Sequence, residues 1–188
     1  MIKAYIDFKS LECFLAIEPI IMLAEEFGVA SDWQPFAKRP VLPTQVEDET
    51  VTQTHKRVRA ESRRRLGLHY ASVRGYEIAK EPSTQDSTKA LMRLYQISGD
   101  RTEFVKHAFD ACWLENKNLD DSNLLDKICQ EASAVYDNTK NDFEESQALA
   151  EEAGLFDAPT FDINGQLFMG RAHIPWIREL LQQAFSSK

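Results

Sequence analysis

The chain begins with a strand pattern that passes directly into a helix pattern. Apolar side chains occupy every second position from Ile2 to Phe8, which is the period of a strand with one buried face. Ser10 then stands at a natural N-cap position, and apolar residues recur at helical spacing from Leu11 to Phe27. Gly28 is the expected C-terminal stop of this helix. The opening segment therefore predicts a strand followed by a long helix.

Strand patterns return after this helix and again near the end of the chain. The run 32–36 is strand-like, and its Pro35 favours a sheet edge. Residues 160–163 and 166–169 form two further strand patterns, and the Asn-Gly pair between them is typical of a tight hairpin turn. Residues 174–185 predict a closing helix. The two ends of the chain therefore read as β-α-β and β-β-α.

The middle of the chain shows helical periodicity broken by polar loops. This pattern predicts helices at 54–73, 89–97, 101–116, 122–136 and 142–152. We therefore expect an α/β fold in which 1–36 and 155–188 form one discontinuous domain. Residues 37–154 are then an all-helical insertion with connecting loops.

Composition narrows the classes of function. The chain has 188 residues and a net charge of −8, which argues against nucleic-acid binding and against binding to an anionic membrane. The start of the sequence lacks a signal-peptide pattern, and no run of about 18 uncharged apolar residues occurs. The three cysteines are irregularly spaced, which is typical of a reducing compartment. A cytoplasmic protein is therefore expected, and no histidine has metal-ligand spacing.

Two short motifs carry the candidate chemistry. The first, Asp-Phe-Lys-Ser-Leu-Glu-Cys at 7–13, ends a strand pattern and opens a helix. At such a helix N-terminus, free N–H groups favour negative charge, so the Ser10 hydroxyl could stabilise a bound thiolate. A plain N-cap role for Ser10 is the alternative. The second motif, Leu-Phe-Asp-Ala-Pro-Thr-Phe at 155–161, opens another strand pattern.

These motifs resemble the two halves of an active site in the DsbA-like branch of the thioredoxin superfamily. Within it, the chain is most similar to 2-hydroxychromene-2-carboxylate isomerases and kappa-class glutathione transferases, which have related motifs after the first strand and before the last hairpin. The resemblance implies a thioredoxin fold with a helical insertion. It also implies a cis peptide bond at Pro159, with the backbone of Ala158 available to a peptide-like ligand.

The resemblance implies an enzyme that uses glutathione, with isomerase or transferase chemistry on a small-molecule electrophile or thiol substrate. Ser10 and Cys13 are the catalytic candidates, and Ser10, Ala158, Pro159 and Arg171 are the candidate cofactor contacts. A homodimer is a further expectation left open. The chain departs from its relatives at Leu11-Glu12, where they have Pro-Tyr, and at 171–172, where they have an Asp that helps to bind the γ-glutamyl end of glutathione.

Two other functions fit the same residues. A dithiol enzyme has Cys-x-x-Cys where this chain has Ser-x-x-Cys, so Cys13 cannot close an intramolecular disulfide with position 10. Cys13 could instead work as the single cysteine of a thiol-disulfide oxidoreductase, or it could be a core residue. Alternatively, the chain could be a non-catalytic module that binds peptides or thiols. Cys112 and Cys129 lie on apolar stripes and are expected in the core.

Overall fold

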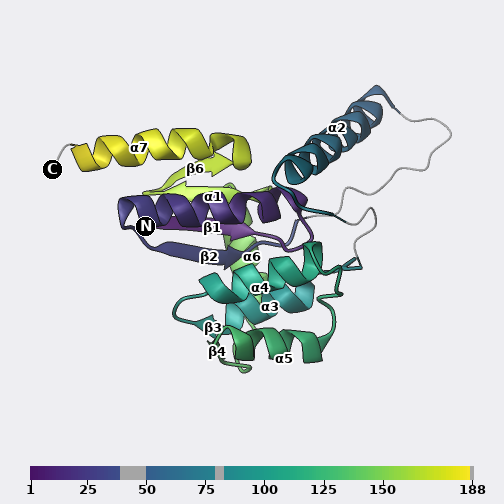
Figure 1. Ribbon diagram of the computed structural model, residues 1–188, viewed down its shortest axis with the longest axis vertical. Coiled ribbons are helices and arrows are strands. Elements are labelled where there is room, and N and C mark those ends of the chain that lie inside the picture. The colour runs from purple at the N-terminus through teal and green to yellow at the C-terminus, as the bar shows by residue number, and fades with distance from the viewer. Residues whose placement is uncertain (39–49, 79–82, 187–188) are drawn as a thin grey trace. The chain divides into compact units, whose positions relative to one another are not determined.

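The computed structural model describes residues 1–38, 50–78 and 83–186 (Figure 1). It divides into two compact units. One comprises Met1–Lys38 and Ala79–Lys188, and the other comprises Arg39–Ile78. The first unit contains the sheet, six of the seven described α-helices and the site discussed below.

Both ends of the chain meet in one four-stranded sheet. Its strands are β1 (Ile2–Ile6), β2 (Ser31–Pro35), β5 (Thr160–Ile163) and β6 (Gln166–Met169), in the order β2-β1-β5-β6. β1 runs parallel to β2 and antiparallel to β5, and β5 pairs with β6 as a hairpin. β2 lies at an edge, as its proline predicts. The strands predicted from the sequence at the two ends are therefore confirmed, and so is their union in one sheet.

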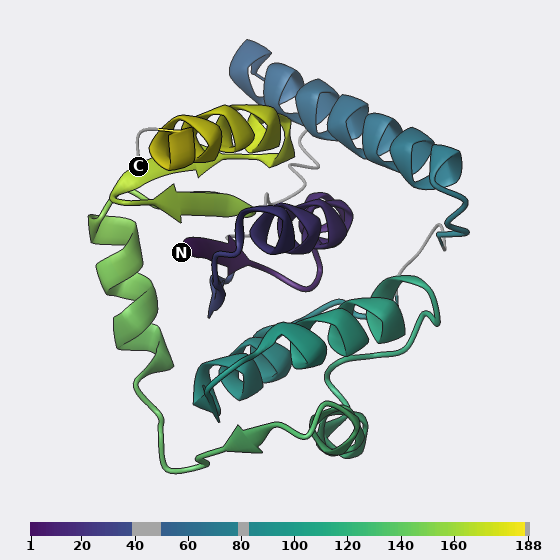
Figure 2. The same cartoon turned by 60° about the vertical axis from the view of Figure 1, so that its left-hand side comes forward.

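Helices cover the sheet on two sides. α1 (Leu11–Phe27) and α7 (Ile174–Ser186) pack against each other on one face (Figures 1 and 2). α6 (Phe143–Glu152) lies over the other face, where its residues line a hollow together with Lys3 and Tyr5. The alternation of β1 explains this arrangement, because its even-numbered side chains are fully buried whereas Lys3 and Tyr5 are only partly buried. The period-2 pattern thus separates a dry face from a more polar one.

Three helices that lie between β2 and β5 in the sequence belong to the same compact unit as the sheet. They are α3 (Thr88–Gln96), α4 (Thr102–Trp113) and α5 (Ser122–Glu131). The ring of Phe8 packs against Phe109 of α4 with ring centroids 4.9 Å apart. The helical block therefore contributes to the core directly beneath the end of β1.

The block is not purely helical, and two helices are shorter than predicted. The helix expected over 122–136 ends at Glu131, and β4 (Val135–Tyr136) pairs antiparallel with β3 (Ile97–Ser98). Ser133 adopts a φ of 51°, which stops the helix, and the following Val-Tyr pair favours a strand. The helix expected over 101–116 likewise ends at Trp113, before Asn116 with its φ of 52°.

The second unit contains α2 (Val51–Val73), which corresponds to the basic helix expected at 54–73. It begins earlier than expected because Thr50 and Gln53 form a capping box, in which each side chain accepts the backbone N–H of the other residue. None of the described helices combines the length and the apolarity that crossing a membrane requires.

Candidate active site

Ser10 caps the N-terminus of α1, at the point where β1 turns into the helix. Its backbone is extended, with φ −95° and ψ 113°, and its Oγ accepts the N–H of Cys13 at 3.4 Å. The residue is only 8% exposed. A helix N-terminus carries unsatisfied N–H groups and a partial positive charge, so this position favours an anion. The geometry thus supports both roles that the sequence left open for Ser10.

Asp7 connects the segments that surround Ser10 at the N-terminus of α1, which we call the helix mouth. Its side chain is fully buried, and its Oδ1 accepts the hydroxyl of Ser87 at 2.6 Å and the N–H of Lys9 at 3.1 Å. Its Oδ2 accepts the backbone N–H of Lys38 at 2.8 Å. One carboxylate therefore ties the end of β1 to the segment after β2 and to the start of α3. A buried carboxylate is tolerated when it accepts several hydrogen bonds in this way.

Cys13 lies beneath this mouth and is fully buried. Burial raises the pKa of its thiol to about 12 because it disfavours the thiolate. The N–H of Asp7, 3.5 Å from Sγ, and the Ser10 side chain favour the thiolate and lower the pKa, but by less. At neutral pH the group is therefore a protonated thiol without access to solvent. This arrangement disfavours the nucleophilic role for Cys13.

The Ala158–Pro159 peptide bond is cis. The Pro159 carbonyl accepts the N–H of Gly170 at 2.7 Å, which secures the start of β5 against the end of β6. The N–H of Ala158 donates to Asp157 Oδ1 at 2.8 Å, and the Ala158 carbonyl accepts from Lys38 Nζ at 3.1 Å. The resemblance implies that the backbone of Ala158 is available to a ligand. In the structure, its N–H and its carbonyl both have partners within the chain.

Lys38 and Asp157 also form an ion pair, with Nζ 2.6 Å from Oδ1. Their side chains are 31% and 34% exposed, so the pair is accessible from solvent. Sequence reasoning identified neither residue as part of the site. Asp157 lies within the motif at 155–161. Lys38 lies in a segment with a loop pattern, and only the folded chain brings it next to Ala158.

Arg171 lies at the first turn of α1. It belongs to the short 3-10 helix η1 (Arg171–His173) after β6, and its Nε is 3.4 Å from Glu12 Oε2. Glu12 and Arg171 therefore form an ion pair beside the helix mouth.

The other cysteines are core residues, as the sequence predicts. Cys112 and Cys129 are both buried and not in disulfides, and burial raises the pKa of each thiol. Among the residues that the structure describes, no group of three or more histidine, cysteine or carboxylate side chains could hold a metal ion.

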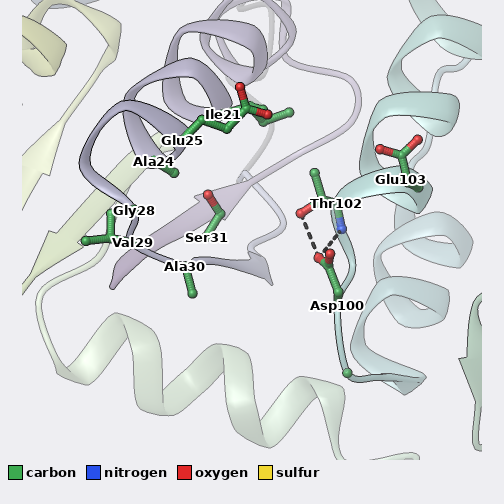
Figure 3. A pocket seen from close by; sticks show the side chains of 11 residues that line it. Ile21, Ala24, Glu25, Gly28, Val29, Ala30, Ser31, Asp100, Thr102 and Glu103 are labelled. Atoms are coloured by element: carbon green, nitrogen blue, oxygen red, sulfur yellow. Dashed lines mark hydrogen bonds between the residues drawn. The ribbon is translucent and has the colours of Figure 1, made fainter.

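An open hollow of about 700 Å³ lies at the opposite end of α1 (Figure 3). Its walls come from the last turns of α1, the start of β2 and the loop before α4. It is lined by Glu25, Asp100 and Glu103 among other residues. Asp100 accepts the N–H and the hydroxyl of Thr102 at 2.9 and 2.7 Å, and these donors lower the pKa of its carboxyl. This end of the helix is therefore acidic.

The comparisons with known proteins agree with this architecture. The solved structure of 2-hydroxychromene-2-carboxylate isomerase superposes with a TM-score of 0.76 and covers 99% of this chain and 96% of its own. Its sequence is 15% identical, so the likeness establishes the fold. No curated protein sequence matches. The family model of the DSBA-like thioredoxin domain matches residues 1–182. The chain therefore belongs to the DSBA-like thioredoxin family.

Proposed function

We propose that the protein is a glutathione-dependent enzyme that performs isomerase or transferase chemistry on a small-molecule electrophile. The observation that carries this proposal is the position of Ser10 at the N-terminus of α1. The bond from Cys13 N–H uses an acceptor lone pair of Oγ, and the hydroxyl proton, which faces the buried Cys13 thiol, can turn to a bound sulfur instead. A bound thiolate there would receive a charge-assisted hydrogen bond in addition to the field of the helix.

The residues around the mouth fit an anionic thiol. Lys9, Lys38 and Arg171 bring cations to the segments that surround Ser10, and each forms an ion pair with a carboxylate there. Asp7 also accepts hydrogen bonds from three donors. Glutathione, when bound, would supply the nucleophilic sulfur. The chain's own part is to hold that sulfur at Ser10, to lower its pKa and to orient the peptide at Ala158.

The substrate class to test first is an aromatic carboxylate. The similar solved structure is an isomerase of 2-hydroxychromene-2-carboxylate. Tests with that compound would therefore address isomerase chemistry, and tests with simple aryl halides would address transferase chemistry.

A second candidate function is a binding module that keeps the groove without the chemistry. The internal partners of Ala158 do not distinguish it from an enzyme, because a ligand must displace them before it can pair with this backbone in either case. A single-cysteine oxidoreductase has less support, because Cys13 is fully buried and protonated at neutral pH.

Ser10→Ala separates these functions. Losing the cap should lower the free energy of unfolding by about 1 kcal/mol. Losing a hydrogen bond to a charged sulfur should weaken the binding of glutathione by roughly 10-fold or more. The measurements are the rise in melting temperature with millimolar reduced glutathione and the thiolate absorbance in the ultraviolet.

Ser31→Ala is the control, because Ser31 is a partly buried serine that lines the hollow at the far end of α1. We expect it to bind glutathione as the wild type does. Wild-type protein that shows no thermal shift with glutathione would refute glutathione dependence. Binding without any turnover of either substrate class would favour the binding module.

A further inference from the structure

Two side chains, Asp157 and Lys38, bridge the N–H and the carbonyl of Ala158. Asp157 Oδ1 accepts the Ala158 N–H at 2.8 Å and also lies 2.6 Å from Lys38 Nζ. Lys38 Nζ in turn donates to the Ala158 carbonyl at 3.1 Å. The N–H, the carboxylate, the ammonium and the carbonyl thus form one closed ring of contacts around Ala158.

We propose that Asp157 is a built-in competitor for the ligand, and that Lys38 is the residue that takes the ligand's carboxylate. This proposal rests on the proposed function and names the ligand class for the same site. The class is a peptide-like thiol that carries a free carboxylate next to an amide. On binding, the ligand carboxylate replaces Asp157 on Lys38, and the Asp157 side chain turns out to solvent.

The exchange is balanced in hydrogen bonds. When Asp157 leaves, the Ala158 N–H loses one acceptor and gains a carbonyl of the ligand. When Lys38 moves to the ligand carboxylate, the Ala158 carbonyl loses one donor and gains an amide N–H of the ligand. Both backbone groups of the buried Ala158 thus keep a partner, which is a condition for low-cost exchange at a site of this kind.

The ion pair is also weak enough to be exchanged. Both side chains are about one-third exposed, with values of 31% and 34%. Pairs with that degree of exposure contribute little, because water screens them. Lys38 is nevertheless well positioned, since its backbone N–H is held at 2.8 Å by the buried carboxylate of Asp7. The site therefore combines a lysine with an anchored backbone and an anion in a partly exposed ion pair.

Asp157→Asn tests the proposal as a gain of function. The amide oxygen of asparagine can still accept the Ala158 N–H, so the variant removes the competing charge and keeps that hydrogen bond. We expect reduced glutathione to bind this variant about fivefold more tightly than the wild type, measured by isothermal titration. Lys38→Met should weaken the binding of glutathione by about fivefold.

Two comparisons make the test specific. Glutathione monoethyl ester lacks the glycyl carboxylate, so it should gain nothing from Asp157→Asn and lose nothing from Lys38→Met. Asp120→Asn removes a negative charge from another lysine–aspartate pair, with 3.3 Å between Asp120 and Lys89, in the helical block. It should bind glutathione as the wild type does. Melting curves of each variant confirm that it is folded, and Asp157→Ser serves if the asparagine variant is not.

The outcomes separate this proposal from the function on which it rests. If Asp157→Asn binds glutathione as the wild type does, or if the ester gains as much as the free peptide, the competitor role is refuted and glutathione dependence stands. If neither the wild type nor any variant binds glutathione, both the proposed function and the competitor role fail.

Discussion

The two ends of α1 differ in how their polar groups are arranged. At the C-terminal end lies an open hollow of about 700 Å³ with three carboxylates in its walls (Figure 3). At the N-terminal end, polar groups from separate segments converge on the buried Asp7 and on the backbone of Ala158. The hollow at the C-terminal end is open, whereas the mouth is built from partners that the fold brings together.

Charge distinguishes the two ends further. The N-terminus of a helix carries about half a positive charge and the C-terminus about half a negative charge. The side-chain charges add little to this difference. Lys38 and Arg171 near the first end are paired with Asp157 and Glu12, and Glu103 near the second is paired with Lys106. The partial charge of the helix itself therefore favours an anionic thiol at the mouth over the far end. The electric field of the helix and the hydrogen bonds of buried polar groups therefore identify the candidate site better than the volume of a hollow does.

The largest expected effect is the loss of Asp7. Asp7→Ala removes the acceptor for the Ser87 hydroxyl and for the N–H groups of Lys9 and Lys38. Hydrogen bonds to a charged group are worth about 1.5–3 kcal/mol, so we expect the free energy of unfolding to fall by about 3 kcal/mol. Urea denaturation measures this loss. The variant should also lose its thermal shift with glutathione, because Lys38 is no longer held.

Asp100→Ala is the matched control at the far end of α1, where Asp100 accepts the N–H and hydroxyl of Thr102. Its loss should resemble that of an exposed cap, about 1 kcal/mol. Glutathione binding should be unchanged. Equal losses of stability in the two variants would contradict the contrast between an organised mouth and a simple hollow.

The second effect depends on pH and concerns the thiol beneath the mouth. The pKa of Cys13 is raised to about 12 in the folded protein, and it returns to about 8.5 on unfolding. Between these values the unfolded chain has lost a proton that the folded chain keeps. Stability is therefore fully present below about pH 8.5 and falls above it, by about 1.4 kcal/mol per pH unit for this group.

Cys13→Ala should make the decline in the free energy of unfolding shallower between pH 8.5 and 10, measured by urea denaturation at each pH. Cys129→Ala is the comparison in the helical block, where burial raises the pKa of another buried thiol. In the wild type, none of the three cysteines should react with a thiol reagent at pH 8 before denaturant is added, because all three are buried. Rapid labelling of Cys13 in the native protein would restore the single-cysteine oxidoreductase as a hypothesis.

The fold was largely predictable from the sequence because its signals are local. The period-2 runs at 2–8 and 160–163, the cap at Ser10 and the stop at Gly28 each depend on neighbouring residues alone. The short ladder of β3 and β4 was missed because a two-residue strand has no period to detect. Its formation depends on the left-handed Ser133, which ends the preceding helix.

The site was only partly predictable, because its decisive contacts join distant segments. Ser10 and the Ala158–Pro159 pair stand in motifs and could be identified directly. Lys38 lies 120 positions from Ala158, and no local pattern links the two residues. Long-range polar partners of this kind become visible only when the sheet brings their segments together.

The smallest expected effect concerns the ion pair of Glu12 and Arg171, which flanks the mouth with 3.4 Å between its charged atoms. Their side chains are 33% and 23% exposed, so a double-mutant cycle with Glu12→Gln and Arg171→Gln should give a coupling energy of roughly 0.5 kcal/mol. At the far end, Glu103 and Lys106 form an i,i+3 pair on α4 with exposures of 54% and 45%. That pair should couple by about 0.3 kcal/mol.

The glutamates of the two ion pairs also differ in their expected effect on glutathione binding. Glu12→Gln removes a negative charge beside the helix mouth, so it should strengthen glutathione binding slightly, by about twofold. Glu103→Gln should not affect glutathione binding, because Glu103 lines the hollow at the C-terminal end of α1. Both coupling energies should shrink in 1 M salt, where the Debye length is about 3 Å. If Glu103→Gln strengthened glutathione binding as much as Glu12→Gln did, net charge rather than the local field at the mouth would govern the affinity.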